Sequence, residues 1–320
     1  MQTTDQLKSF FTEHWKYMAV STACKLNFFD QLLNEGKTSE ELSNELDLNK
    51  KETLQLLNAL VSFGFLKKER NIFSLTNISL HLTENHPQSF KYACLNWSAE
   101  HLNAWQHLYH SIQTGESSFE KLYGSSYFDF LNAHPDKLIN YHRAMNEYAR
   151  EDYASLPHII DWSQYNTLID VGGGFGSAIQ AIKQCYPNLA CSLFDLELVI
   201  NNSGVKDVET IGGNFFENIP GTYDAMILSR VLHDWEDDKT IAILSNCYNA
   251  LSENGTLFVI ENCSTNLDDS LALLSLNMLA MCKSYERSEN EYINLCNKTG
   301  FSFHSKKQLN SLQTILIFRK

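Results

Sequence analysis

The segment "SRVLHDW", residues 229–235, places a histidine directly after an apolar run that is typical of a buried strand. An imidazole with a pKa of about 6.5 can take up a proton at neutral pH, and it works best as a base when a carboxylate holds one ring nitrogen. Glu261 ends a second apolar run, "TLFVIE". Because parallel strands bring their carboxyl ends to one edge of a sheet, His233 and Glu261 could reach the same crevice. We interpret His233 as a candidate general base; a helix cap or a surface histidine is the alternative.

A second candidate site is the glycine-rich segment "LIDVGGGFG", residues 168–176. A short apolar strand is predicted over 167–171, a helix over 178–185, and a second strand over 190–194 that ends on Asp195. This order predicts a β–α–β unit whose first turn is rich in glycine.

The residues of this turn favour a nucleoside as the ligand. Gly172 and Gly174 would let a ligand lie against bare backbone, and Asp195 could accept both ribose hydroxyls. The dinucleotide fingerprint also requires a glycine at its sixth position, where this chain has Ser177. A nicotinamide enzyme therefore stays a weaker alternative.

Further strands predict the sheet that carries these residues. They are expected over 208–211, 225–228, 256–260, 301–305 and 314–318, the last two as an antiparallel hairpin. Together with the β–α–β unit, they give an α/β fold with a Rossmann-like, seven-stranded sheet.

The first part of the chain, residues 1–95, predicts a separate and mostly helical domain. A helix over 40–46 with Ser39 as its cap, a leucine-rich helix ended by Gly64, and a hairpin around Arg70 follow the order of a winged helix. The second domain is expected over 96–320. Its first part, 96–160, is a helical linker whose aromatic side chains could line an apolar pocket.

Charge argues against the DNA-binding role that a winged helix raises. The formal net charge is −13, and residues 1–90 hold nine Lys and Arg against eleven Asp and Glu. A domain that binds in a groove of DNA should be basic. We therefore expect the first domain to have a dimerising role, and we expect no nucleic-acid partner. The chain has no run long enough for a membrane span, no signal-peptide pattern and no CxxC among its eight cysteines. We expect a cytoplasmic protein without structural zinc.

The motifs "LIDVGGGFG", "LFDLELVI", "GGNFF", "SRVLHDW", "LFVIEN" and "SYERSENEY" together resemble those of the metal-independent small-molecule O-methyltransferases. That family combines a winged-helix dimerisation domain with a domain for S-adenosylmethionine. The resemblance covers nearly the whole chain. It implies a homodimer that transfers a methyl group from S-adenosylmethionine to a hydroxyl of a small metabolite, with an aromatic acceptor expected.

Carried over residue by residue, the resemblance implies three sets of site residues and no metal ligand. The catalytic set is His233 as base, flanked by Glu261 and Glu286. The cofactor set is Asp170, Gly172, Gly174, Asp195, Leu196, Gly213, Asn214, Phe215 and Arg230. The substrate set is Met145, Trp97, Asn277, Met278 and Met281. The family usually has Asp at position 214 and often Pro at position 197, where this chain has Asn and Glu. Glu286 lies in "YERSENE", which could instead be a solvated acidic turn.

The chemistry fits a hydroxyl acceptor. A sulfonium methyl group needs no acid to leave, so the protein has to position the nucleophile. A phenol has a pKa of about 10 and needs a base at neutral pH. Methylation of nitrogen or carbon, or a reaction without methyl transfer, stays as an alternative on the same fold.

Overall fold

The computed structural model describes residues 4–263 and 269–320. The chain divides into two compact units, 1–102 and 103–320. The helices are α1 Thr4–Lys25, α2 Phe28–Gln31, α3 Ser39–Glu45, α4 Lys50–Ser62, α5 Asn77–Leu80, α6 Lys91–Trp97, α7 Glu100–Gln106, α8 Leu108–Thr114, α9 Ser118–Tyr123, α10 Tyr127–Ala133, α11 Pro135–Asp152, α12 Leu156–Ile159, α13 Ser177–Cys185, α14 Glu197–Ser203, α15 Asp237–Ala250, α16 Asp269–Cys282 and α17 Glu289–Lys298, with 3-10 turns η1 Trp162–Gln164 and η2 Leu232–Asp234. The strands are β1 Lys37–Thr38, β2 Leu66–Glu69, β3 Ile72–Leu75, β4 Thr167–Val171, β5 Ala190–Asp195, β6 Glu209–Gly212, β7 Tyr223–Ser229, β8 Leu251–Asn262, β9 Ser302–Gln308 and β10 Gln313–Arg319.

The first unit contains the predicted helix, helix and hairpin. Its small sheet has the order β1-β3-β2, with both pairs antiparallel. The cap of α3 is Thr38 and not Ser39, because Thr38 forms a capping box with Glu41. Gly64 follows the end of α4 with a φ of 80°, a conformation that glycine adopts without a steric penalty.

The core of the first unit leaves part of α1 uncovered. Buried side chains such as Phe28, Leu57 and Phe73 form its interior. In contrast, Phe10 is 73% exposed and Trp15 is 65% exposed, and both lie on α1. Large apolar side chains at this exposure are typical of a contact surface.

The second unit is built on the predicted seven-stranded sheet, in the order β6-β5-β4-β7-β8-β10-β9. Neighbouring strands from β6 to β8 are parallel, whereas β10 is antiparallel to both β8 and β9. The last two strands of the chain, β9 and β10, therefore form the predicted hairpin. The prediction of a seven-stranded sheet is confirmed.

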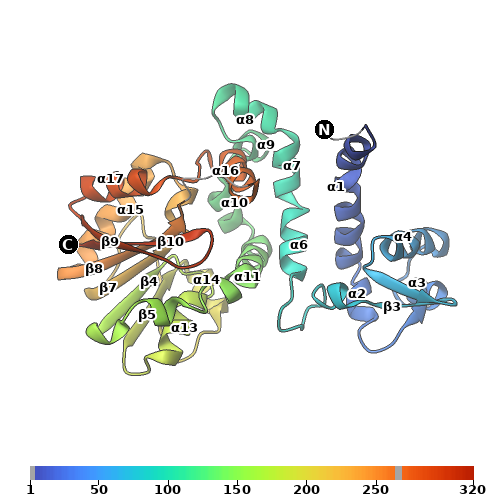
Figure 1. Cartoon of the computed structure of the whole chain (residues 1–320), viewed down its shortest axis with the longest axis horizontal. Helices are drawn as coiled ribbons and strands as arrows, with labels where there is room; N and C mark the ends of the chain where they lie inside the picture. Colours follow the sequence, from blue (N-terminus) through green and yellow to red (C-terminus); the bar gives the residue numbers. More distant parts are fainter. Residues whose placement is uncertain (1–3, 264–268) are drawn as a thin grey trace. The chain divides into compact units, whose positions relative to one another are not determined.

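Helices cover both faces of this sheet because alternate side chains of each strand are apolar on both sides. Ile169 and Val171 of β4 belong to a core shared with α15 and α17. Leu168 of the same strand belongs to a second core, shared with α12 and α13. Figure 1 shows α15 and α17 on one side of the sheet and α13 on the other.

The strand order reverses between β4 and β7, which lie side by side at the centre of the sheet. In open α/β sheets, ligands bind beyond the carboxyl ends of the strands at such a reversal. The glycine turn follows β4, and His233 follows β7, so the fold brings both candidate segments to this edge. Among the described residues, no helix combines the length and apolarity that a bilayer crossing requires.

Candidate active site

The glycine turn after β4 has no room for a side chain at Gly172 or Gly174 without strain. Gly172 and Gly174 have φ values of 69° and 60°, in the left-handed region. A Cβ atom on Gly172 would lie 2.9 Å from Val231, and one on Gly174 would lie 3.1 Å from His142 Nδ1. Glycine therefore leaves the backbone bare at these two positions.

Asp195 at the end of β5 is hydrogen-bonded to this turn. Its Oδ2 accepts from the Gly174 N–H at 2.8 Å, and its Oδ1 accepts from the Leu196 N–H at 2.7 Å. The Gly213 N–H donates to the Asp195 carbonyl at 2.9 Å. Each carboxylate oxygen has a further lone pair, so the side chain can still accept ribose hydroxyls.

Asp170 lies behind the turn as a buried carboxyl group without a hydrogen bond. It is 1% exposed, and neither of its oxygens has a hydrogen-bond partner in the structure. Burial, and then the negative charge of Asp195, raise the pKa of Asp170 to about 7. Two carboxyl groups beside a bare backbone favour a ligand that brings hydroxyl donors and positive charge.

His142 on α11 covers the turn, a position that the sequence did not reveal. Its ring stacks on Phe175, with centroids 5.6 Å apart and planes at 28°. Burial lowers the pKa of His142, which favours the neutral ring. On the same helix, Asn146 Oδ1 accepts from Ser177 Oγ at 2.6 Å. The helical run of 135–152 gave no signal for this contact, because it depends on how α11 packs against α13.

Asn214 and Phe215 follow the strand β6. The Asn214 carbonyl oxygen accepts from the Phe216 N–H at 3.0 Å, and its amide donates to Glu217 at 3.3 Å. The amide is therefore engaged within its own turn. The ring of Phe215 lies near Gly172, since a Cβ atom there would be 3.5 Å from it.

His233 lies in the η2 turn beyond β7 and is 4% exposed. Its Nδ1 is 2.7 Å from Glu286 Oε1, and its Nε2 is 3.6 Å from Asp234 Oδ1. The Glu286 side chain is only 1% exposed, so the alternative of a solvated acidic turn is wrong for this residue. A carboxylate on Nδ1 fixes the ring and directs Nε2 to a reacting partner.

The charges around His233 favour its protonated form. Burial alone would lower the pKa of His233, but Asp234 and Glu286 outweigh burial and raise that pKa to about 9. Burial tends to raise the pKa of Glu286, but the charge of His233 outweighs it and holds that pKa below its ordinary value. Both shifts describe an imidazolium–carboxylate pair in the free protein.

Glu261 does not hold the imidazole, contrary to the expectation from its place at the end of a strand. Its Oε1 accepts from the N–H groups of Val231 and Leu232, at 3.1 and 2.8 Å. β8 extends to Asn262, so Glu261 lies within the strand and reaches the backbone of the turn. Its other oxygen is buried without a partner, and burial raises the pKa of Glu261 to about 7. Ligand atoms of His233, Glu261 and Glu286 lie within 4.8 Å of one another.

Arg230 lies between the end of β7 and the η2 turn. It has a φ of 55°, and its N–H donates to the Ile260 carbonyl at 2.9 Å. Its Nε is buried without a hydrogen bond. Burial would lower the pKa of Arg230, but nearby carboxylates, with Glu286 first, raise it.

The residues predicted for the substrate side have different surroundings. Asn277 Oδ1 accepts from Trp105 Nε1 at 2.8 Å, and Met278 is buried. Met281 is 1% exposed within a core of Phe119, Tyr127 and Leu131, so it serves packing. Met145 is half-buried on α11. Trp97 belongs to the first unit, where its ring contacts His101. Phe128, one of the aromatic residues of the predicted helical linker, stacks on Trp235 with centroids 5.1 Å apart.

These observations fit S-adenosylmethionine. Gly172 and Gly174 would lie against it, Asp195 would accept its ribose hydroxyls, and Phe215 would pack on its base. The carboxyl groups of Asp170 and Asp195 match its positive charge. 

Comparison with known proteins gives the same assignment. Residues 105–302 match the O-methyltransferase domain family, and residues 9–85 match the O-methyltransferase dimerisation domain. The phenazine O-methyltransferase PhzM of Lysobacter antibioticus is 30% identical over 307 residues, covering 92% of this chain and 90% of that protein.

Solved structures agree in fold. The crystal structure of LaPhzM superposes with a TM-score of 0.95 at 29% identity, covering 100% of this chain and 99% of that one. An O-methyltransferase from neocarzinostatin biosynthesis, in complex with S-adenosylmethionine and 2-hydroxy-5-methyl naphthoic acid, has a TM-score of 0.82 at 25% identity, covering 94% and 95%. The chain belongs to the O-methyltransferase family and is an S-adenosylmethionine-dependent O-methyltransferase.

Proposed function

We propose that this enzyme methylates a hydroxyl group of a small aromatic metabolite and that His233 is its general base. The observation that carries the proposal is the 2.7 Å contact between His233 Nδ1 and Glu286 in a buried site. With Nδ1–H donated to Glu286, the lone pair of Nε2 is left for the hydroxyl proton of the acceptor.

The chain's own groups account for the proton. When bound, S-adenosylmethionine supplies an electrophilic methyl group on a positively charged sulfur. Its charge opposes that of an imidazolium, so donor binding should lower the pKa of His233 from about 9 and yield the neutral base. His233 then takes the hydroxyl proton at Nε2, and Glu286 stabilises the imidazolium at Nδ1. Activity should therefore rise with pH as His233 loses its proton.

The surroundings support an aromatic acceptor. Phe128 and Trp235 stack near the η2 turn, and the half-buried Tyr141 contacts Phe128 edge-on, with centroids 6.0 Å apart. Flat apolar side chains favour a flat apolar ligand. The names of two relatives refer to aromatic compounds, a phenazine and a hydroxynaphthoic acid.

We also infer a homodimer formed through the first unit. A dimerisation domain matches residues 9–85, and α1 exposes Phe10 and Trp15. The acidic charge argues against nucleic acid as a partner. All eight cysteines are free thiols, which suits the reducing cytoplasm.

The test of the base is His233→Ala, measured against phenols of graded pKa. We expect turnover to fall by roughly 10²–10⁴-fold at neutral pH, and the loss to shrink for phenols that are already ionised. Glu286→Gln should shift the acid limb of the rate profile to lower pH, because a neutral amide no longer stabilises the imidazolium. His158→Ala, an exposed histidine of the same unit, is the control.

Calorimetry of donor binding separates a lost base from a lost site. The affinity for S-adenosylmethionine should hardly change in His233→Ala. Equal loss of activity on every phenol, irrespective of its pKa, would show that His233 is not the base.

A further inference from the structure

We propose that Arg287 is a positioning residue that fixes the main chain on both sides of His233 and so keeps the imidazole on Glu286. The inference rests on the proposed function, in which His233 is the base. Arg287 touches none of the reacting groups; it acts through the turn that carries them.

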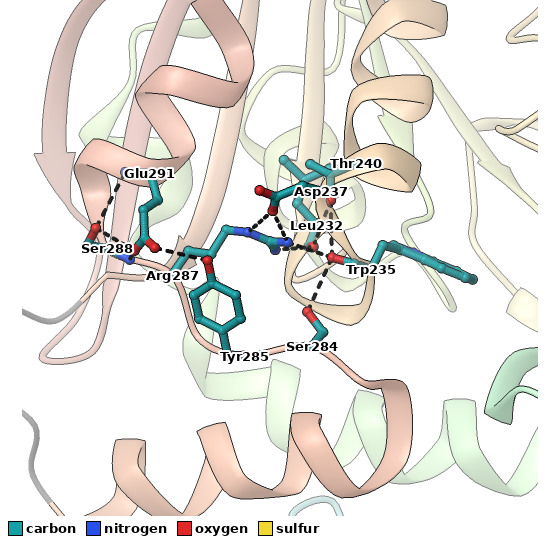
Figure 2. A network of polar contacts seen from close by, with 9 residues as sticks. All are labelled: Leu232, Trp235, Asp237, Thr240, Ser284, Tyr285, Arg287, Ser288 and Glu291. Atoms are coloured by element: carbon teal, nitrogen blue, oxygen red, sulfur yellow. Dashed lines mark hydrogen bonds and ion pairs between the residues drawn. The ribbon is translucent and has the colours of Figure 1, made fainter. Parts of the chain in front are cut away.

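The contacts of Arg287 bracket His233 in the sequence. Its Nη1 donates to the carbonyl of Leu232 at 3.0 Å, and its Nη2 donates to the carbonyl of Trp235 at 2.7 Å. These carbonyls lie one residue before and two residues after His233. Figure 2 shows the guanidinium between them and Asp237, whose Oδ1 accepts from Nη2 and Nε at 2.8 and 3.1 Å.

Other side chains hold the same carbonyls from other elements. Ser284 Oγ and Thr240 Oγ1 each donate to the Trp235 carbonyl at 3.2 Å. These hydroxyls leave the Leu232 carbonyl mainly to Arg287, because the contact of Thr240 with it is longer, at 3.5 Å. Loss of the guanidinium would therefore loosen the residue immediately before the base.

The position of Arg287 in the chain links it to Glu286. The two residues are consecutive, yet Glu286 contacts the ring of His233 while Arg287 contacts the backbone of the same turn. One short segment thus holds the imidazole by its ring and by its main chain. The Glu286 N–H is itself held by Ser275 Oγ at 3.4 Å.

Burial makes this contact specific for arginine. Arg287 is 1% exposed, and the Tyr285 ring lies 5.1 Å from its guanidinium carbon. A planar fork of donors can span two carbonyls and a carboxylate at once, whereas an ammonium group acts as a single point. Lysine would keep the charge and lose the span.

The experiment compares Arg287→Lys with Asp237→Asn, first alone and then in the His233→Ala background. Arg287→Lys should lower turnover by roughly 10- to 100-fold, the scale of a misplaced catalytic group, with the KM for S-adenosylmethionine unchanged. Asp237→Asn keeps both carbonyl contacts, and Asp237 is 55% exposed, so its loss should be much smaller. In the His233→Ala background, Arg287→Lys should cause no further loss, because the group through which it acts is gone.

A second readout does not depend on turnover. The His233 ring can be titrated by NMR with 13C-labelled histidine, and His233→Ala assigns its signal. Arg287→Lys should move the titration midpoint toward that of an ordinary histidine, since the ring is no longer held on Glu286.

The outcomes separate the two proposals. An unchanged midpoint in a folded Arg287→Lys variant, or full additivity with His233→Ala, would overturn the positioning role. A shifted midpoint together with an active His233→Ala enzyme would keep the positioning role and reject His233 as the base.

Discussion

Asp170→Asn should stabilise the protein at alkaline pH and leave its stability almost unchanged in acid. Asp170 is buried, its oxygens lack hydrogen bonds, and its pKa is raised to about 7 by burial and by Asp195. Ionisation of this group therefore opposes folding. The penalty is absent below pH 3.8, grows as the pH rises toward 7, and is complete above it.

The size of the effect follows from the pKa. A rise from 3.8 to about 7 corresponds to about 4 kcal/mol at most. The variant would still bury an amide without a hydrogen-bond partner, and this cost offsets part of the increase in stability. We expect the free energy of unfolding to increase by about 2 kcal/mol at pH 8, or roughly 4 °C in Tm.

Denaturant unfolding at pH 4.5 and pH 8, read by fluorescence, measures this difference. Glu253→Gln removes an exposed carboxylate on β8 and should give no pH-dependent change. Affinity for S-adenosylmethionine at pH 8 should fall in Asp170→Asn, because a carboxylate that would complement the positive charge of the donor is lost. An equal effect of Asp170→Asn at both pH values would refute the burial argument.

Two further changes test the cofactor turn and the dimer. Gly174→Ala and Gly204→Ala both place a side chain at a left-handed φ, at about 1–2 kcal/mol each, but only the Gly174 Cβ would meet a neighbour, His142 at 3.1 Å. Both variants should lose stability, while only Gly174→Ala should lose affinity for S-adenosylmethionine, by roughly 10-fold in calorimetry; equal affinities would remove Gly174 from the binding surface. Trp15→Glu places a charge on the exposed face of α1, and light scattering should then detect monomers. A variant that stays dimeric would exclude this face as the interface.

The sequence predicted the sheet well because its strands carry a strong pattern. The apolar runs 167–171 and 225–228 are buried on both faces, so each reads as a strand without help from the rest of the chain. The glycine turn was equally visible, since left-handed backbone requires glycine.

Contacts between residues that are far apart in the sequence were harder to predict. Glu261 was expected on the ring of His233 because it ends an apolar run, yet its carboxylate turns to the backbone N–H groups of the η2 turn. Glu286 lies in a segment with no regular pattern, so only the family resemblance pointed to it, and its contact with Nδ1 of His233 follows from the packed structure. The contacts of His142 and Arg287 were not predicted either, because their partners are distant in the sequence. His142 lies beside Gly174, 32 positions away, and Arg287 donates to the carbonyl of Leu232, 55 positions away.

The burial of the His233–Glu286 pair has a consequence for turnover. If His233 takes the hydroxyl proton, the positive charge that enters on sulfur does not leave with the products; it stays behind on the imidazole. Because His233 is only 4% exposed and its neighbouring carboxylates raise its pKa, release of that proton to solvent is disfavoured. Each cycle therefore ends with an enzyme that must be discharged before it can act again. Under this scheme, the exchange of one proton with buffer becomes a step of the catalytic cycle, and the concentration of a small, penetrating buffer base becomes a determinant of its rate.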